Sequence, residues 1–84
     1  MSELTAAGKL FGERLREVRR KRGITQVQLS DATGVPQAHI SNLERGTMLP
    51  TLGTMIRFAV ALDCKVSTFV SVFDKEDLTK LLPK

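Results

Sequence analysis

The sequence lacks tryptophan and tyrosine, and its only aromatic residues are four phenylalanines. Their apolar neighbours place all four in a core, which excludes an aromatic platform for stacking single-stranded bases. The single cysteine excludes an internal disulfide and predicts a reducing, cytoplasmic compartment. No stretch reaches the roughly 20 apolar residues of a membrane-spanning helix, and the N-terminus lacks a signal-peptide pattern. We therefore expect no membrane association.

The chain is also poor in the residues that carry chemistry. His39 is the only histidine and Cys64 the only cysteine, so together they supply too few ligands for a zinc site. A Ser-His-Asp hydrolase would need His39 held by a carboxylate beside an oxyanion hole, and no pattern in the sequence indicates one. A phosphate-cradling glycine loop is missing too. The expectation is a protein that is not an enzyme and that uses neither a metal nor a cofactor.

What the sequence does contain fits one small folded domain. It has 84 residues, of which 42% are hydrophobic, an ordinary value for a globular chain and too high for a disordered one. The formal net charge is +4 and the sequence pI is about 9.7, which favours a polyanionic partner such as nucleic acid. Charge alone leaves open a basic surface that serves only solubility.

Residues 25–46 are the most informative stretch, because their pattern predicts two short helices joined by a tight turn. Thr25 can cap the first helix, and Gln28 three residues later completes a capping box. Gly34 can end that helix in the left-handed conformation. Pro36 then starts the second helix with φ already near the helical value.

Apolar spacing sets the inner edge of each of these two helices. Leu29 and Ala32 lie three residues apart in the first helix, and Ile40 and Leu43 lie three apart in the second. The outer faces of the second helix are left with Gln37, Ala38, His39, Ser41, Asn42 and Arg45.

Two more helices are predicted around this pair. The first helix of the chain carries the apolar stripe Phe11, Leu15 and Val18, and it ends in a basic run that its dipole favours. The predicted helices cover residues 9–22, 26–33, 37–45 and 52–62. The expected organisation is a flexible polar arm (1–8), the domain itself (9–72) and a short C-terminal extension (73–84).

The helix predicted over residues 52–62 is apolar around much of its circumference. Its expected inner face consists of Leu52, Met55, Ile56, Ala59 and Leu62. Phe58 and Val60 lie off that stripe, which predicts either a homodimer contact or a cover formed by the chain's own C-terminal segment. Residues 64–73 fit two patterns, a helical stripe and a β-branched strand paired across a dimer.

In their order and spacing these motifs resemble the DNA-binding domain of the phage repressor and Cro family, also called the XRE family. The resemblance runs from about residue 10 to about residue 69, and its marks include Gly23-Ile24-Thr25-Gln26, Gly34-Val35, Ile40-Ser41, Leu43-Glu44-Arg45-Gly46 and Pro50-Thr51-Leu52. It implies an all-α, compact five-helix, lambda-repressor-like fold, with a fifth helix over about 66–72. Cys64 then stands at a core position, as a buried and unreactive thiol. Pro36 departs from the family, which usually has a capping Ser or Thr there.

The resemblance also implies roles for individual residues. The second helix of the pair would enter the major groove and read bases with Gln37, Ala38, His39 and Asn42. DNA phosphates would be bound by Gln26, Arg45, Gly46, Thr47 and Arg22. For Arg22, a solvated helix end is the other interpretation. Arg19 and Glu44 match the family's structural ion pair and are expected to brace the domain.

The expected function is that of a sequence-specific transcriptional regulator, a repressor that binds a double-stranded DNA operator as a homodimer. A phage-type repressor, an antitoxin-like autorepressor and a restriction-modification controller all fit this description. The alternative is a protein-interaction adaptor that uses the same fold without specific DNA binding. A toxin or a polymerase as protein partner also stays open.

Overall fold

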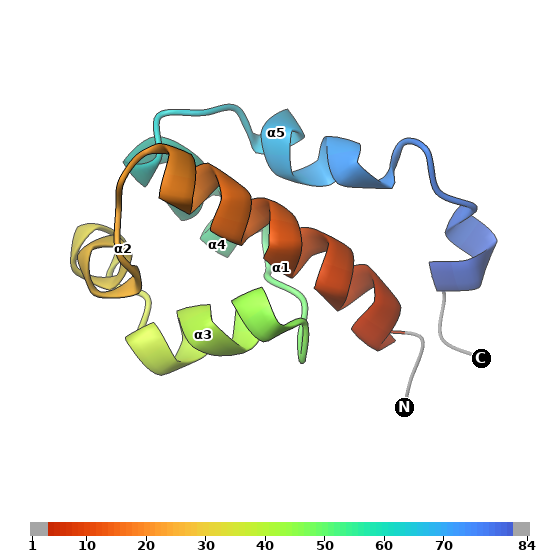
Figure 1. The fold of residues 1–84 in the computed structure, drawn as a ribbon, viewed down its shortest axis with the longest axis horizontal. Helices are drawn as coiled ribbons and strands as arrows, with labels where there is room; N and C mark the ends of the chain where they lie inside the picture. The colour runs from red at the N-terminus through yellow and green to blue at the C-terminus, as the bar shows by residue number, and fades with distance from the viewer. Residues whose placement is uncertain (1–3, 82–84) are drawn as a thin grey trace.

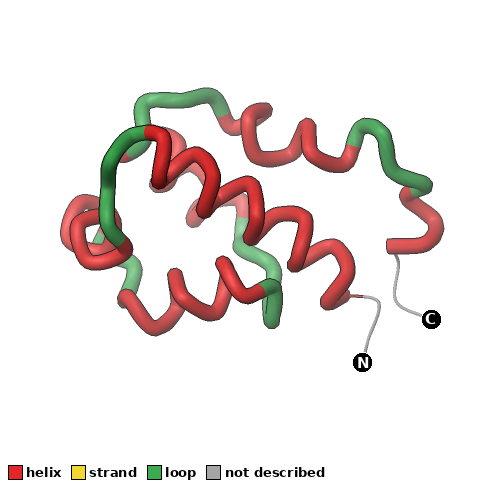
Figure 2. Tube along the Cα trace, in the orientation of Figure 1, coloured by secondary structure: helices red, strands yellow, loops and turns green. Residues whose placement is uncertain are grey.

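The structure, a computed structural model, describes residues 4–81 as five α-helices followed by two short 3₁₀ turns (Figure 1). The helices are α1 (Leu4–Lys21), α2 (Gln26–Thr33), α3 (Gln37–Arg45), α4 (Leu52–Ala61) and α5 (Val66–Val70), and the turns are η1 (Ser71–Phe73) and η2 (Leu78–Leu81). No strand occurs between residues 4 and 81 (Figure 2), which confirms the expected all-α, five-helix class. Within the same range, no helix combines the length and apolar character needed to cross a membrane.

The segment 64–73, which fitted both a helix and a dimer-pairing strand, is helical from Val66 onward. It begins with α5 at Val66, as the family resemblance implies, and continues directly into η1. Phe69 is fully buried against α1, and the Nη1 group of Arg14 donates a hydrogen bond to the carbonyl oxygen of Thr68 at 2.6 Å. These contacts with α1 hold the segment as a helix within one chain.

The first helix begins at Leu4 and not near Lys9. The prediction of a flexible arm is therefore wrong for residues 4–8, while residues 1–3 lie outside the described part of the chain. The physical reason is tertiary. Gly8 is buried, and a Cβ atom added to it would lie 2.6 Å from the carbonyl oxygen of Gly46 at the end of α3. Because α3 packs on this first part of α1, the helix extends beyond its own periodic apolar stripe.

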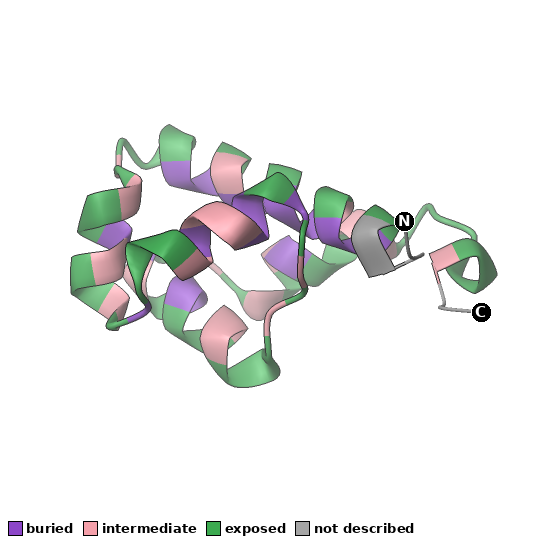
Figure 3. Cartoon of the chain, turned by 90° about the horizontal axis from the view of Figure 1, so that it is seen from below, coloured by how far each residue is buried: buried purple, intermediate pink, exposed green. Residues whose placement is uncertain are grey.

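The core lies where α1 meets the helices around it, and Figure 3 shows buried positions on every one of the five helices. The stripe predicted on α1 is confirmed, since Phe11, Leu15 and Val18 are all buried. The rings of Phe11 and Phe69 pack in a tilted arrangement with centroids 5.8 Å apart. Each fully buried side chain of this size contributes about 1.5–3 kcal/mol. The other buried hydrophobic side chains in this cluster are Leu29, Val35, Ile40, Leu43, Phe58, Ala59 and Leu62.

The face that α4 turns to the core differs from the prediction. Phe58, expected off the inner stripe, is completely buried, whereas Leu52 and Ile56, expected inside, are 61% and 47% exposed. Val60 is 77% exposed and continues the outer row of Leu52 and Ile56. A helix that is apolar almost all round has no periodicity that selects one face, so packing against α2 and α5 makes the choice.

The C-terminal extension forms η2 and borders an apolar cavity of about 410 Å³. Leu78 and Leu81 line this cavity together with Phe11, Met55 and Phe73. Leu78 is exposed and Leu81 is half-buried, so the extension covers the cavity only in part. Residues 82–84, the end of the predicted extension, fall outside the described range.

Candidate nucleic-acid interface

The start and the end of α2 are set by its own sequence. The backbone N–H of Gln28 donates to Thr25 Oγ1 at 3.1 Å, and the backbone N–H of Thr25 donates to Gln28 Oε1 at 2.9 Å. This reciprocal pair is the expected capping box. Gly34 ends α2 with φ 77°, in the left-handed region, and its N–H donates to the carbonyl oxygen of Ser30 at 2.8 Å.

The turn between α2 and α3 is closed by Thr33. Its hydroxyl donates to the carbonyl oxygen of Leu29 at 2.7 Å and accepts the N–H of Val35 at 3.1 Å. Pro36 then occupies the N-cap position of α3 with no side-chain cap. The carbonyl oxygen of Pro36 accepts the N–H groups of His39 and Ile40 at 3.0 and 3.1 Å. The backbone alone therefore starts α3, which has an open N-terminal turn.

The inner side of α3 is tied to α1 through Glu44. Its two carboxylate oxygens accept from Arg19, Oε2 from Nε at 2.6 Å and Oε1 from Nη2 at 2.9 Å. Both residues are buried, with 8% of Arg19 and 5% of Glu44 exposed. The remaining Nη1 group of Arg19 donates to the carbonyl oxygen of Ile24 at 2.9 Å. This fork-to-fork geometry fixes orientation as well as distance, and we call the pair the Arg19–Glu44 brace.

Two further donors converge on the same carboxylate. Gln26 Nε2 lies 3.1 Å and Arg16 Nε 3.4 Å from Glu44 Oε1. Burial by itself raises the pKa of Glu44, but the hydrogen bonds from Arg19, Gln26 and Arg16 outweigh it and hold that pKa below its usual value. For Arg19, the hydrogen bond to Glu44 outweighs burial and raises the pKa of the guanidinium. Both groups of the brace are therefore charged near neutral pH.

Gln26 thus has a contact that the sequence did not reveal. It was expected to bind a phosphate at the start of α2, and in this structure its side-chain nitrogen faces Glu44 of α3. The side chain is half-buried at the start of α2, so it joins the brace to the helix pair.

The outer side of α3 carries the side chains expected to read bases. Gln37 and Ala38 are exposed, His39 and Asn42 are half-buried, and between them Ile40 turns into the core. Helical spacing therefore places Ala38 and Asn42 on the outward side of α3, with Gln37 on one flank and His39 on the other. His39 also lines a hollow with Pro36 and Arg57. No acidic side chain of α3 is exposed, because Glu44 is buried in the brace.

Arg45 lies along this outer surface and contacts two of its neighbours. Its Nη1 group donates to Ser41 Oγ at 2.7 Å, and its Nη2 group donates to Asn42 Oδ1. A guanidinium has only donors, so the atom of Asn42 that faces it must be the carbonyl oxygen. The amide nitrogen of Asn42 is left with its donors free of Arg45.

Gly46 and Thr47 close the C-terminal end of α3. Gly46 has φ 80°, and its N–H donates to the carbonyl oxygen of Leu43 at 3.1 Å. The N–H and the hydroxyl of Thr47 both donate to the carbonyl oxygen of Asn42, at 3.2 and 3.0 Å. The donors of these two residues therefore cap the helix in this structure.

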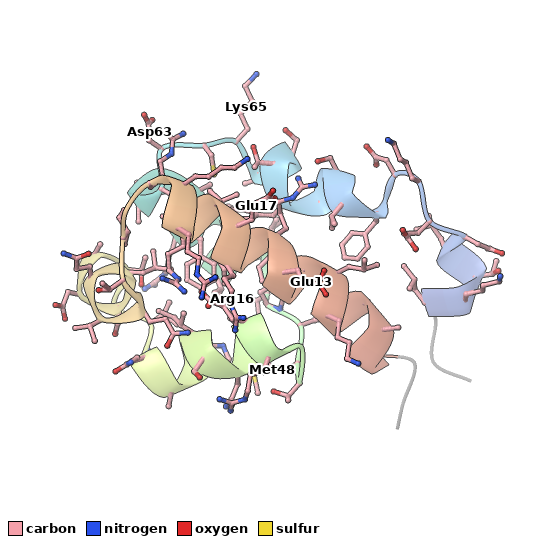
Figure 4. All side chains as sticks on the ribbon, in the orientation of Figure 1. Glu13, Arg16, Glu17, Met48, Asp63 and Lys65 are labelled. Atoms are coloured by element: carbon pink, nitrogen blue, oxygen red, sulfur yellow. The ribbon has the colours of Figure 1, made fainter. Side chains whose placement is uncertain are left out.

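Arg22 is separated from the phosphate-binding residues expected at the end of α3. Its Nη2 group donates to the carbonyl oxygen of Asp63 at 2.9 Å, in the loop after α4. In Figure 4, Asp63 lies on the opposite side of α1 from Met48, which follows α3.

Arg22 also lines a polar hollow with Cys64 and Thr68. Cys64, expected to be buried, is only half-buried. This partial burial raises the pKa of its thiol, against a smaller opposite effect of the Arg22 charge. Between residues 4 and 81, no three potential metal ligands cluster.

Two glycines of α1, Gly8 and Gly12, set the position of α3. A Cβ atom on Gly12 would lie 2.3 Å from the carbonyl oxygen of Leu43 and 2.7 Å from that of Glu44. Gly8 makes the similar close approach to Gly46 described above. Glycines four residues apart on a helix lie on one face and let another backbone approach, so their spacing was the available signal.

The fold and the polar outer surface of α3 identify the class of protein. The protein is a small helix-turn-helix domain in which α2 and α3 are held by caps and a buried brace, and α3 presents a polar outer surface. The family model described as Helix-turn-helix matches residues 15–69, more than half of the chain. The chain therefore belongs to the helix-turn-helix family of DNA-binding transcriptional regulators, of the phage repressor and Cro (XRE) type.

Individual relatives agree with this assignment. The chain is 43% identical over 54 residues to y4dL, an uncharacterised HTH-type transcriptional regulator of Sinorhizobium fredii, a match that covers 64% of the chain and 28% of the relative. It is 34% identical over 59 residues to the immunity repressor protein of Bacillus phage phi105, covering 70% of the chain and 41% of that repressor. The chain thus matches less than half the length of each of these relatives.

A solved structure shows the same fold. The restriction-modification controller protein C.AhdI from Aeromonas hydrophila superposes with a TM-score of 0.73 and 31% sequence identity. The superposition covers 76% of this chain and 97% of the controller protein. The similarity therefore extends over nearly all of a protein of this class.

Proposed function

We propose that this protein binds specific sequences of double-stranded DNA as a homodimer through α3, and that it acts as a repressor of transcription. One observation carries the proposal. The inner side of α3 is anchored by the Arg19–Glu44 brace, while its outer side presents amides and an arginine with no exposed acid. The net charge of +4 suits a polyanion. The likeness to an immunity repressor supports repression over activation.

Base reading would rest mainly on Gln37 and Asn42. Gln37 is the first residue of α3 and is exposed, so its amide can pair with both N6 and N7 of adenine. Asn42 would act through its free amide nitrogen, which suits an acceptor such as guanine N7 or O6, or thymine O4. Ala38 can place its methyl against that of a thymine, and His39 can reach a base or a phosphate.

Contacts with the DNA phosphate backbone would come chiefly from Arg45. Its guanidinium has five N–H donors, and the bonds to Ser41 and Asn42 leave others free for a phosphate oxygen. We propose Gly46, Thr47 and Gln26 as further phosphate contacts, made when DNA replaces some of their present hydrogen bonds. Arg22 would have to leave the carbonyl oxygen of Asp63 to take part.

The homodimer would form through the outer row of α4. Leu52, Ile56 and Val60 are spaced by four residues and form an exposed apolar stripe on that helix. Phe58, expected beside Val60 at this contact, is buried and is not part of this surface. Two-fold symmetry would place the two recognition helices in half-sites about 34 Å apart, or a multiple of that.

Light scattering tests the dimer. The parent protein should have the molar mass of a dimer at micromolar concentration, and the Val60→Lys variant should have that of a monomer. Val27→Lys is the matched control, because Val27 is also exposed and apolar but lies on α2. A parent that is monomeric both with and without DNA would contradict the homodimer.

DNA binding is tested by fluorescence anisotropy with duplexes selected from a random library. Affinity should fall linearly with the logarithm of salt concentration. Gln37→Ala should weaken the selected site by about 1–3 kcal/mol and relax the preference at one base pair. If the parent binds no duplex at low salt, the adaptor function gains support. If Gln37→Ala leaves affinity and preference unchanged, α3 is not the reading helix.

A further inference from the structure

Lys9 lies directly against the C-terminal end of α3. The contact is with Gly46, where a Cβ atom would lie 2.8 Å from the N, Cα and Cγ atoms of Lys9. Only glycine leaves room for α1 at this point, and the positive φ of 80° at Gly46 also favours glycine. Lys9 therefore sits on the residue between Arg45 and Thr47, two of the expected phosphate-binding residues.

The placement of Lys9 is enforced by its neighbours on α1. One residue earlier, Gly8 approaches the same end of α3, since a Cβ there would lie 2.6 Å from Gly46 O and 3.3 Å from Met48 O. One turn later, Gly12 lies on the backbone of Leu43 in the same way, at 2.3 Å. Three close backbone approaches thus fix the position of the Lys9 backbone relative to α3.

The charge of Lys9 is available to a ligand. Its side chain is exposed, and the carboxylates that form ion pairs in the described part of the chain, Glu17 and Glu44, pair with arginines and with Lys21. Arg45, the residue before Gly46, is exposed as well, and its guanidinium lies back along α3 at Ser41 and Asn42. Two cationic residues from different helices, Lys9 and Arg45, therefore adjoin Gly46 at the end of α3.

We propose that Lys9 is a further DNA-phosphate contact, supplied by α1 and acting beside Arg45. This inference rests on the proposed function. An ammonium is a compact point charge on a flexible stem, which suits a phosphate oxygen better than the paired atoms of a base edge. Lys9 therefore adds affinity that is independent of sequence and sensitive to salt.

The test compares Lys9→Gln with Lys65→Gln. Glutamine keeps much of the stem that packs on Gly46 and removes the charge. Lys65 is the matched control, because it is also exposed and precedes α5 without a side-chain cap. Figure 4 shows it on the opposite side of the molecule from Met48 and the end of α3. Anisotropy titrations over a range of salt concentrations give the slope of log affinity against log salt for each variant. A binding matrix for each variant gives its base preference.

Lys9→Gln should lower the slope of log affinity against log salt by about 0.9 per protomer, which amounts to about fivefold in affinity per protomer at 0.15 M salt. The preferred sequence should stay the same, and Lys65→Gln should match the parent. Equal slopes for Lys9→Gln and Lys65→Gln would overturn the inference while the proposed function stands. A changed preference at one base pair would overturn it as well, by making Lys9 a base reader. A parent without DNA binding at low salt would remove the proposed function itself.

Discussion

Glu44 and Arg45 are adjacent in the sequence, yet Glu44 faces the interior of the domain and Arg45 faces solvent. The Glu44 side chain is 0% exposed and accepts hydrogen bonds from α1 and α2. Arg45 is exposed and donates only to Ser41 and Asn42 of its own helix. The inner contact joins parts of the chain that are far apart in sequence, whereas the outer one is local and can be exchanged for a ligand.

Burial makes these two sets of charged contacts very different in energy. When one partner of a buried ion pair is removed, the other charge stays uncompensated in a low-dielectric site, which costs about 3–5 kcal/mol. An exposed pair is screened by water and contributes about 0–1 kcal/mol. The inner side of α3 should therefore determine stability, and the outer side should determine what the protein binds.

The largest expected effect is that of Glu44→Ala. It should lower the free energy of unfolding by about 3–5 kcal/mol, because Arg19 would remain buried without a partner. Urea unfolding followed by circular dichroism measures the loss. Glu13→Ala is the control, an exposed carboxylate on α1 whose removal should change stability by less than about 0.5 kcal/mol. A loss below about 1 kcal/mol for Glu44→Ala would show that the inner and outer contacts do not differ.

The next effect is that of Gly12→Ala, which tests the inner side without changing a charge. The added methyl would meet the carbonyl oxygen of Leu43 at 2.3 Å, and over-packing of this kind costs about 1–3 kcal/mol. Gly53→Ala is the matched control, because Gly53 is also helical and its nearest outside atom would be 3.9 Å away. That change should stabilise the protein by about 0.4–1 kcal/mol. Equal effects of the two variants would mean that α1 and α3 are not in close contact.

Lowering the pH should have a smaller effect on the free energy of unfolding. The pKa of Glu44 is lower in the folded protein than its usual value, so its charge stabilises the fold above the pKa of the unfolded chain. That stability is lost as the pH falls through the lowered pKa. The difference in unfolding free energy between the parent and Glu44→Gln should therefore be full at pH 7 and shrink below about pH 4. A difference that stays constant from pH 7 to pH 2 would contradict a charged Glu44.

The smallest effect on stability is expected from changes at Arg45. Arg45→Lys should change the free energy of unfolding by less than about 0.5 kcal/mol. It keeps the charge but loses the forked contact with Ser41 and Asn42, so the salt slope should persist while the preference at one base pair relaxes. A binding matrix for the parent and this variant measures the change. An unaltered matrix would mean that Arg45 does not orient Asn42.

Much of the helix pair could be predicted because its signals are local. The capping box of Thr25 and Gln28, the left-handed Gly34 and the inner edge of Ile40 and Leu43 each depend on residues within one or two turns. Their spacing alone decides which side of α3 faces the core. The residues on its outer surface, including Gln37, follow by exclusion, and their contacts with DNA remain predictions.

The sequence by itself therefore determined the order of the first four helices, the apolar stripe of α1 and the outward surface of α3, whereas contacts with α1 decided that residues 66–70 form a helix. Only the tertiary structure decided where α1 begins, which face α4 buries, and that Lys9 stands beside the cap of α3. The reason is physical: α1 is extended by glycine contacts with residues more than 30 positions away. Likewise, α4 is apolar on nearly every side, so the shape of its neighbours selects Phe58 over Ile56 for the core.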